Sequence, residues 1–70
     1  MATVQTALTI LRRKQVEART GLSRSTIYLR VAEGSFPAPV SLGGRAVGWI
    51  EAEVNDWLAK RIEASRKATR

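Results

Sequence analysis

Side chains that can hydrogen-bond to nucleic acid are concentrated in one short stretch, between Ser23 and Gly34. They are Arg24, Ser25, Thr26, Tyr28 and Arg30. The same stretch contains a single acid, Glu33. Guanidinium and hydroxyl groups donate hydrogen bonds to base edges in the major groove and to phosphate oxygens. If the stretch is helical, it therefore predicts contact with double-stranded DNA; the alternative is the solvent-exposed polar face of an ordinary helical hairpin.

The residues around this stretch predict two short helices joined by a tight turn, over residues 14–34. Gly21 can adopt a positive φ at no steric cost, which a sharp turn between helices needs. Ser23 is a favoured N-cap, because its hydroxyl can accept a hydrogen bond from a free amide of the next turn. Gly34 is a favoured end for the second helix. The pattern is that of a helix-turn-helix, with the second helix as the recognition helix.

Helical periodicity divides this second helix into a buried face and an outward face. Ile27 and Val31 lie four residues apart, so both fall on one apolar side. Ser25 and Leu29 then lie opposite Ile27. An outward face of this kind fits the width of the major groove.

Basic residues are unevenly distributed along the chain. Its 70 residues carry a net charge of +6, from 12 Lys and Arg against 6 Asp and Glu. Residues 1–30 hold six cations and one acid, residues 31–59 one cation and four acids, and residues 60–70 five cations and one acid. Clustered positive charge attracts polyanions and accelerates their encounter. The alternative is that the charge serves solubility alone.

Three consecutive cations, Arg12, Arg13 and Lys14, are expected at the start of the first helix. Cations oppose the helix dipole at this end, at a cost of about a few tenths of a kcal/mol each. Contact with DNA phosphates would explain their presence, as it would for Ser23 at the next helix start. The alternative is that the three side chains extend into water.

A β-hairpin is predicted after the second helix. Residues 40–42 and 46–49 alternate loosely between apolar and polar, and a Gly-Gly pair followed by Arg45 lies between them. Such a hairpin beside a recognition helix would be a wing, with Gly44 and Arg45 at its tip against the phosphate backbone or the minor groove. The alternative is a plain surface turn.

The remaining apolar residues predict the supporting elements. Residues 9–11 favour a short strand, because β-branched residues dominate, and Phe36 is expected to anchor the proline-containing segment on the core. A last helix is predicted to begin at Trp49 or Ile50. Its apolar stripe consists of Ile50, Val54, Trp57, Leu58 and Ile62. Both tryptophans are interpreted as core anchors.

Composition excludes several kinds of function. The chain has no Cys and no His, so disulfides, thiolate or imidazole metal sites and His general bases are excluded, and we expect neither metal nor other cofactor. Glu51, Glu53 and Asp56 are interpreted as solvated or capping groups of one helix, and the chain is therefore not expected to be an enzyme. No apolar run approaches the roughly 20 residues of a membrane span. A cytoplasmic location is expected, because a small fold without disulfides fits a reducing compartment.

Three runs together resemble the AlpA-type family of small phage and prophage regulators, relatives of the excisionase and MerR-like winged-helix group. The runs are VEARTGLSRSTIY, GSFPAPVSLGGRAVGW and EVNDWL, and the resemblance extends from about Ile10 to Ile62. It implies a DNA-binding regulator of a phage or mobile element that acts in a bacterial cell. It also places Arg24, Ser25, Thr26 and Tyr28 on the recognition helix and Arg45 on the wing.

The expected structure is mainly α with a small β-hairpin: a winged helix-turn-helix of three helices and a wing. It comprises a flexible arm (residues 1–7), the DNA-binding domain (8–64) and a basic, fraying tail (65–70). The expected partner is double-stranded DNA, with self-association and an integrase or recombinase as further partners. Two alternatives stay open: an excisionase-like architectural factor, and a small basic adaptor that binds an acidic protein.

Overall fold

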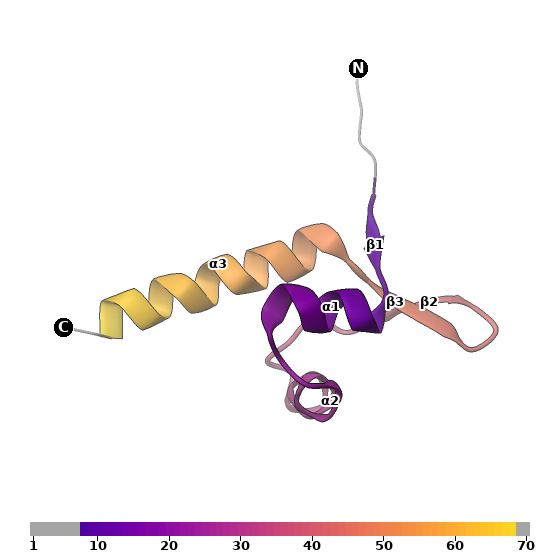
Figure 1. The fold of residues 1–70 in the computed structure, drawn as a ribbon, viewed down its shortest axis with the longest axis horizontal. Coiled ribbons are helices and arrows are strands. Elements are labelled where there is room, and N and C mark those ends of the chain that lie inside the picture. The colour runs from indigo at the N-terminus through magenta and orange to yellow at the C-terminus, as the bar shows by residue number, and fades with distance from the viewer. Residues whose placement is uncertain (1–7, 69–70) are drawn as a thin grey trace, which may run out of the picture.

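The computed structural model describes residues 8–68; the predicted arm at residues 1–7 lies outside them. The elements are β1 (Ile10–Leu11), α1 (Arg13–Thr20), α2 (Arg24–Glu33), β2 (Val40–Gly43), β3 (Ala46–Ile50) and α3 (Glu51–Ala68). The predicted fold class, helices with a small β-hairpin, is confirmed. Within the described residues there are three helices, as expected (Figure 1).

The strands form one antiparallel sheet in the order β1-β3-β2. β2 and β3 make the predicted hairpin, in which Val40 pairs with Gly48. β1 confirms the short strand predicted near residues 9–11, and it lies along the other edge of β3, with Leu11 opposite Trp49. The wing is therefore tied to the chain segment that leads directly into α1.

Local sequence explains the turn between α1 and α2. Gly21 has φ 75°, and its amide donates to the Glu17 carbonyl at 2.8 Å. Ser23 is the N-cap of α2, where its hydroxyl accepts from the Thr26 amide at 3.3 Å. Gly34 ends α2 with φ 80°. The predicted helix-turn-helix and its capping residues are confirmed.

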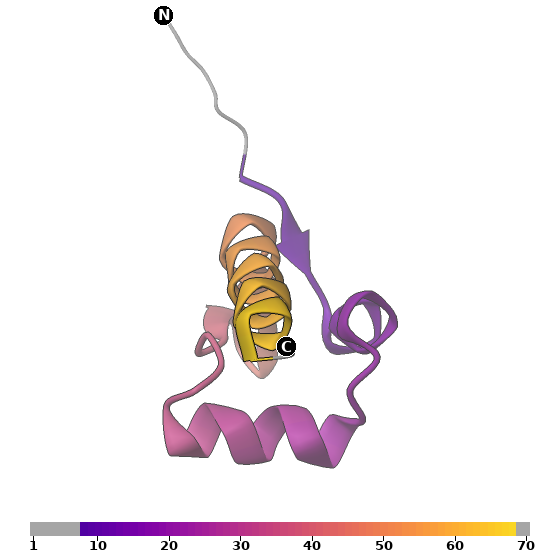
Figure 2. The ribbon, with the colours of Figure 1, turned by 90° about the vertical axis from the view of Figure 1, so that its left-hand side faces the viewer.

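α2 lies at one side of the molecule and packs against the other elements with one face only. In Figure 2 α2 crosses beneath α3, which is seen end-on, while α1 lies beside α3 and above one end of α2. One face of α2 therefore points into the protein and the opposite face points outward. An outward-facing helix is the arrangement that insertion into a groove requires.

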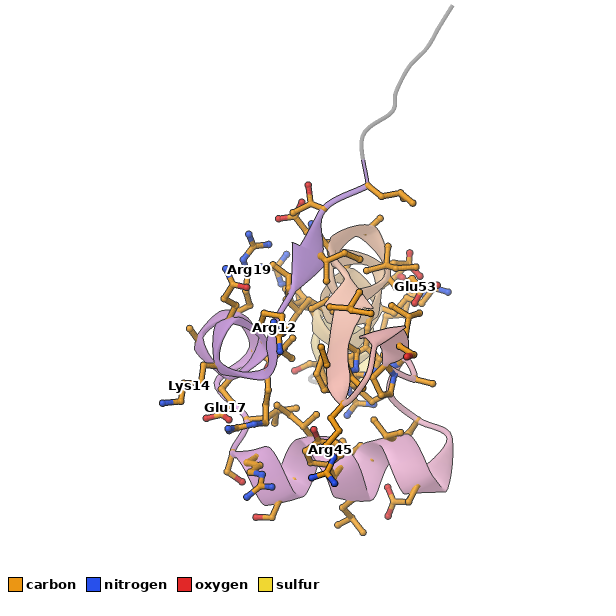
Figure 3. All side chains as sticks on the ribbon, turned by 90° about the vertical axis from the view of Figure 1, so that its right-hand side faces the viewer. Arg12, Lys14, Glu17, Arg19, Arg45 and Glu53 are labelled. Carbon is orange, nitrogen blue, oxygen red and sulfur yellow. The ribbon has the colours of Figure 1, made fainter. Side chains whose placement is uncertain are left out.

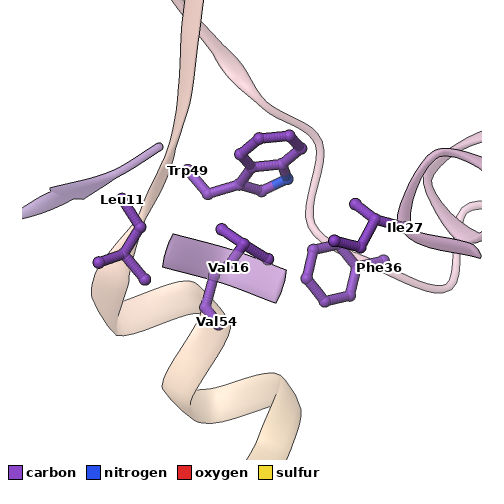
Figure 4. Packing of buried hydrophobic residues seen from close by; sticks show 6 residues of the cluster. All are labelled: Leu11, Val16, Ile27, Phe36, Trp49 and Val54. Atoms are coloured by element: carbon purple, nitrogen blue, oxygen red, sulfur yellow. The ribbon is translucent and has the colours of Figure 1, made fainter. Parts of the chain in front are cut away.

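A small apolar core joins the three helices to β1 and β3 (Figure 4). It consists of Leu11, Val16, Ile27, Phe36, Trp49 and Val54. Each of these residues comes from a different element or connecting segment. The orientation of α2 therefore depends on Ile27, which is fully buried in this core.

The two tryptophans hold the proline-containing segment against the core. The Trp49 Nε1–H donates to the Pro37 carbonyl at 2.8 Å, and the Trp57 Nε1–H donates to the Ser35 carbonyl at 2.6 Å. Phe36 packs edge-on against Trp57, with ring centroids 4.8 Å apart. The anchoring roles predicted for these three aromatic residues are confirmed.

The predicted start of the last helix is wrong, because Trp49 and Ile50 end β3 and α3 begins at Glu51. Both residues are held in the strand by pairing with β1. That pairing also provides a partner at the helix start, since the Glu51 amide donates to the Thr9 carbonyl at 2.8 Å. The prediction placed Ile50 in the helix because its spacing of four residues from Val54 fits the helical period.

The far end of α3 also differs from expectation. Ile62 is 49% exposed instead of buried, so the apolar stripe that contacts the protein ends at Leu58. The helix continues through Ala68, beyond the domain limit expected at residue 64. The domain limits and the fraying of the tail stay predictions. None of the helices in the described part of the chain is long and apolar enough to cross a membrane.

Gly48, at the centre of the sheet, has no room for a side chain. A Cβ there would lie 2.4 Å from Ile10 Cγ2 and 3.1 Å from the Leu11 carbonyl oxygen. We expect Gly48→Ala to lower the free energy of unfolding by about 1–2 kcal/mol through overpacking, measured by urea denaturation. In an Ile10→Ala background the same change should cost less, because the nearest clash is gone. An equal cost in both backgrounds would contradict this explanation.

Candidate nucleic-acid interface

The outward face of α2 carries Ser25 and Leu29, one helical turn apart, and both are exposed. Arg24 is exposed beside them, with its guanidinium 6.0 Å from the centre of the Tyr28 ring. Tyr28 is 39% exposed, and its ring also approaches Trp49, at 6.1 Å between centroids. Tyr28 therefore connects the core to this outward face, and its position is restrained from both sides.

Two other side chains of α2 that were expected at the interface are half-buried, namely Thr26 and Arg30. Thr26 is occupied at the helix start, because its hydroxyl oxygen accepts from the Ser23 hydroxyl at 3.0 Å. Ser23 is exposed, and its hydroxyl oxygen caps α2 through a separate bond, in which it accepts from the Thr26 backbone amide. Within the predicted set on α2, the structure therefore leaves Arg24, Ser25 and Tyr28 as the exposed side chains with polar groups.

Beside α2 the structure forms a recess of about 450 Å³, which we call the cationic recess. It is lined by Arg12, Arg13, Lys14, Tyr28, Arg45 and Val47. The start of α1, the hairpin and α2 each contribute to it. Figure 3 shows Arg12 and Lys14 on the α1 side and Arg45 at the hairpin end, in front of α2. The triplet, the wing tip and the recognition helix, which the sequence presents separately, therefore meet at one site.

Arg12 and Arg13 also have structural partners that sequence reasoning missed. The Arg12 Nε–H donates to the Val47 carbonyl at 3.0 Å, which joins the start of α1 to the hairpin. Arg13 forms an ion pair with Glu17, four residues later, at 2.6 Å. The Arg13–Glu17 spacing is a signal visible in the sequence. The contact between Arg12 and Val47 has no such signal, because 35 positions separate the two residues.

The cationic recess keeps most of its positive charge. Glu17 offsets Arg13, but within the described residues neither Lys14 nor Arg45 has a carboxylate partner. Arg12 keeps its two terminal nitrogens after donating through Nε to Val47. The recess is therefore suited to an anion such as a phosphate group.

Arg19 is the one cation of α1 that faces elsewhere. Its guanidinium pairs with Glu51 at 2.6 Å and donates to Asn55 at 3.3 Å. Both partners belong to the first turns of α3. Arg19 therefore joins α1 to α3, and its charge is compensated there.

A larger recess, of about 720 Å³, lies between α3 and the segment that follows α2. Prolines and Trp57 line it, together with Glu53 and with Asp56, which pairs with Lys60 at 3.2 Å. Acids at such a surface repel phosphate groups. We therefore place the candidate interface at α2 and the cationic recess, although this recess is the smaller of the two.

An outward-facing second helix after a glycine turn, flanked by a hairpin with a cationic tip, defines a winged helix-turn-helix. The chain belongs to the AlpA family, because the family model described as "Prophage CP4-57 regulatory protein (AlpA)" matches residues 9–62. That match includes every described strand and both helices of the helix-turn-helix.

Two relatives illustrate the family. The chain is 40% identical over 65 residues to the DNA-binding transcriptional activator AlpA of Escherichia coli K12, a match covering 84% of this chain and 93% of that protein. It is 53% identical over 57 residues to the uncharacterized protein ORF88 of Enterobacteria phage P4. The second match covers 81% of this chain but only 64% of the phage protein.

Proposed function

We propose that this protein is a sequence-specific, double-stranded DNA-binding transcriptional regulator of a phage or mobile element, acting in the bacterial cytoplasm. The observation that carries the proposal is the cationic recess beside the exposed face of α2. The relative named as a DNA-binding transcriptional activator supports the same class of function.

In the proposed complex, α2 enters the major groove. Arg24, Ser25 and Tyr28 are its exposed polar side chains, and they would contact base edges and the adjacent backbone. The cationic recess would hold phosphates of the flanking strand and thereby set the position of α2 along the groove. Arg12 has two roles in this complex. Its bond to the Val47 carbonyl holds the wing against α1, and its terminal nitrogens would contact a phosphate.

Selection of bound molecules from a random duplex library tests this proposal. We expect a shared sequence to be enriched, and binding to the enriched duplex to weaken as salt rises, because counterions are released from the phosphates. The same sequence as a single strand is the control. Absence of any enriched sequence, or equal affinity for the single strand, would overturn the proposal.

A second measurement separates regulation from DNA architecture. With the selected site placed upstream of a reporter gene, we expect the transcript level to change when the protein is supplied. Strong DNA bending with an unchanged transcript level would contradict the regulatory proposal and would favour the excisionase-like alternative.

Arg45→Ala tests the phosphate role of the wing tip. We expect the plot of log affinity against log salt to become less steep by about 0.9, the contribution of one phosphate contact. Fluorescence anisotropy at several salt concentrations measures this slope. Lys60→Ala is the matched control, because it removes one positive charge at the larger recess, away from the candidate interface. Identical slopes for Arg45→Ala and the wild type would remove the wing from the interface.

A further inference from the structure

We propose that Leu29 recognises the C5-methyl group of a pyrimidine in the major groove. This inference rests on the proposed function, because it assigns a ligand to one position on the outward face of α2. It goes further by identifying an apolar determinant of sequence specificity among polar neighbours.

The position of Leu29 follows from helical geometry. Ile27 is fully buried, and two residues along an α-helix correspond to a rotation of roughly 200°. Leu29 therefore lies nearly opposite the core contact, where it is 58% exposed. Ser25 lies one turn before it on the same face. A side chain at this place is directed into the groove when α2 is inserted.

The fold does not use Leu29 for its own packing. The apolar contacts of the helix-turn-helix are made by Val16 and Ile27, with Leu22 and Val31 packed against them. Leu29 is absent from this cluster, and no described element covers it. Leu29 can therefore contribute to binding only when a ligand buries its side chain.

Chemistry limits what that ligand can be. A leucine side chain neither donates nor accepts hydrogen bonds, so it gains nothing from phosphates or from the polar atoms of base edges. The apolar group among the base-edge features of the major groove is the C5-methyl of thymine. A methylated cytosine presents the same group at the same ring position. Both sources share the chemistry that Leu29 would recognise.

The test uses the enriched duplex and measures affinity by fluorescence anisotropy. Each thymine is replaced in turn by deoxyuridine, which removes the methyl and keeps the base pair. For the wild type we expect a loss of about fourfold at one position, the value of one buried CH₂-sized group. For Leu29→Ala, affinity for the unmodified duplex should fall and the loss at that position should disappear.

Two controls make the result specific. Ile62→Ala truncates a comparably exposed side chain on the projecting part of α3 and should keep the wild-type response. At the sensitive position, 5-methylcytosine paired with guanine should bind better than unmodified cytosine if the methyl alone is recognised. No gain from methylation would restrict the source to thymine, and far-UV circular dichroism should show unchanged helix content in both variants.

The outcomes separate this inference from the proposed function. If the wild type binds its enriched duplex but tolerates deoxyuridine everywhere, the role of Leu29 is overturned and DNA binding stands. If the wild type and Leu29→Ala lose affinity equally, another residue contacts the methyl and the inference is again overturned. If no duplex is enriched, both proposals fall.

Discussion

Trp49→Ala will leave a large fraction of the domain unfolded at room temperature. The Trp49 side chain is fully buried where β3 meets α1, α2 and the proline-containing segment. Truncating a buried Trp costs about 3–5 kcal/mol. A domain of this size has a free energy of unfolding of only about 3–5 kcal/mol. The two quantities are comparable, so this one substitution removes most of the stability.

Urea denaturation followed by circular dichroism at 222 nm measures this effect. Trp49→Phe is the matched control, because it keeps an aromatic ring but removes the hydrogen bond to the Pro37 carbonyl. We expect the Phe variant to fold and to unfold at a lower urea concentration than the wild type. If Trp49→Ala unfolded at the same urea concentration as the wild type, the core would not depend on this side chain.

Arg24→Ala will weaken binding to the selected DNA sequence by about 1–3 kcal/mol, or roughly 5- to 150-fold. Arg24 is exposed in the first turn of α2, and the nearby Tyr28 ring restrains its guanidinium. A guanidinium held at this place can donate two parallel hydrogen bonds to guanine. Competition binding against the selected duplex and against a scrambled duplex measures the loss on each.

Arg24→Lys distinguishes base recognition from charge. Lysine keeps the positive charge but lacks the planar pair of donors, so we expect it to restore affinity for scrambled DNA more than for the selected sequence. If alanine weakens both duplexes equally and lysine restores both, Arg24 contacts a phosphate. In that case the base-recognition role is wrong, although the DNA-binding proposal stands.

Features that depend on close neighbours in the chain were predictable from the sequence. Gly21 has the positive φ that its position predicted, Gly34 ends α2 as expected, and Ser23 caps α2. The hairpin around the Gly-Gly pair forms where alternation and turn residues placed it. Each of these depends on backbone conformation within a few residues, so residue type and spacing are sufficient.

Helical periodicity was less reliable at the ends of the last helix. The spacing from Ile50 to Val54 fits a helix, yet Ile50 belongs to β3 because it pairs with Ile10. Ile62 continues the same period but has no element to pack against. Periodicity shows which residues could share a face, and only the neighbouring elements determine how far that face is used.

Taken alone, the sequence determined the helix-turn-helix, its caps, the hairpin and the excess of positive charge. Tertiary structure decided that Arg12 joins the wing to α1, that Arg19 is compensated by Glu51, and that Lys14 and Arg45 line one recess. The physical reason is how far apart the interacting residues lie in the sequence. Caps and turns form between adjacent residues, whereas the cationic recess exists only because β1 pairs with β3 and brings distant cations together.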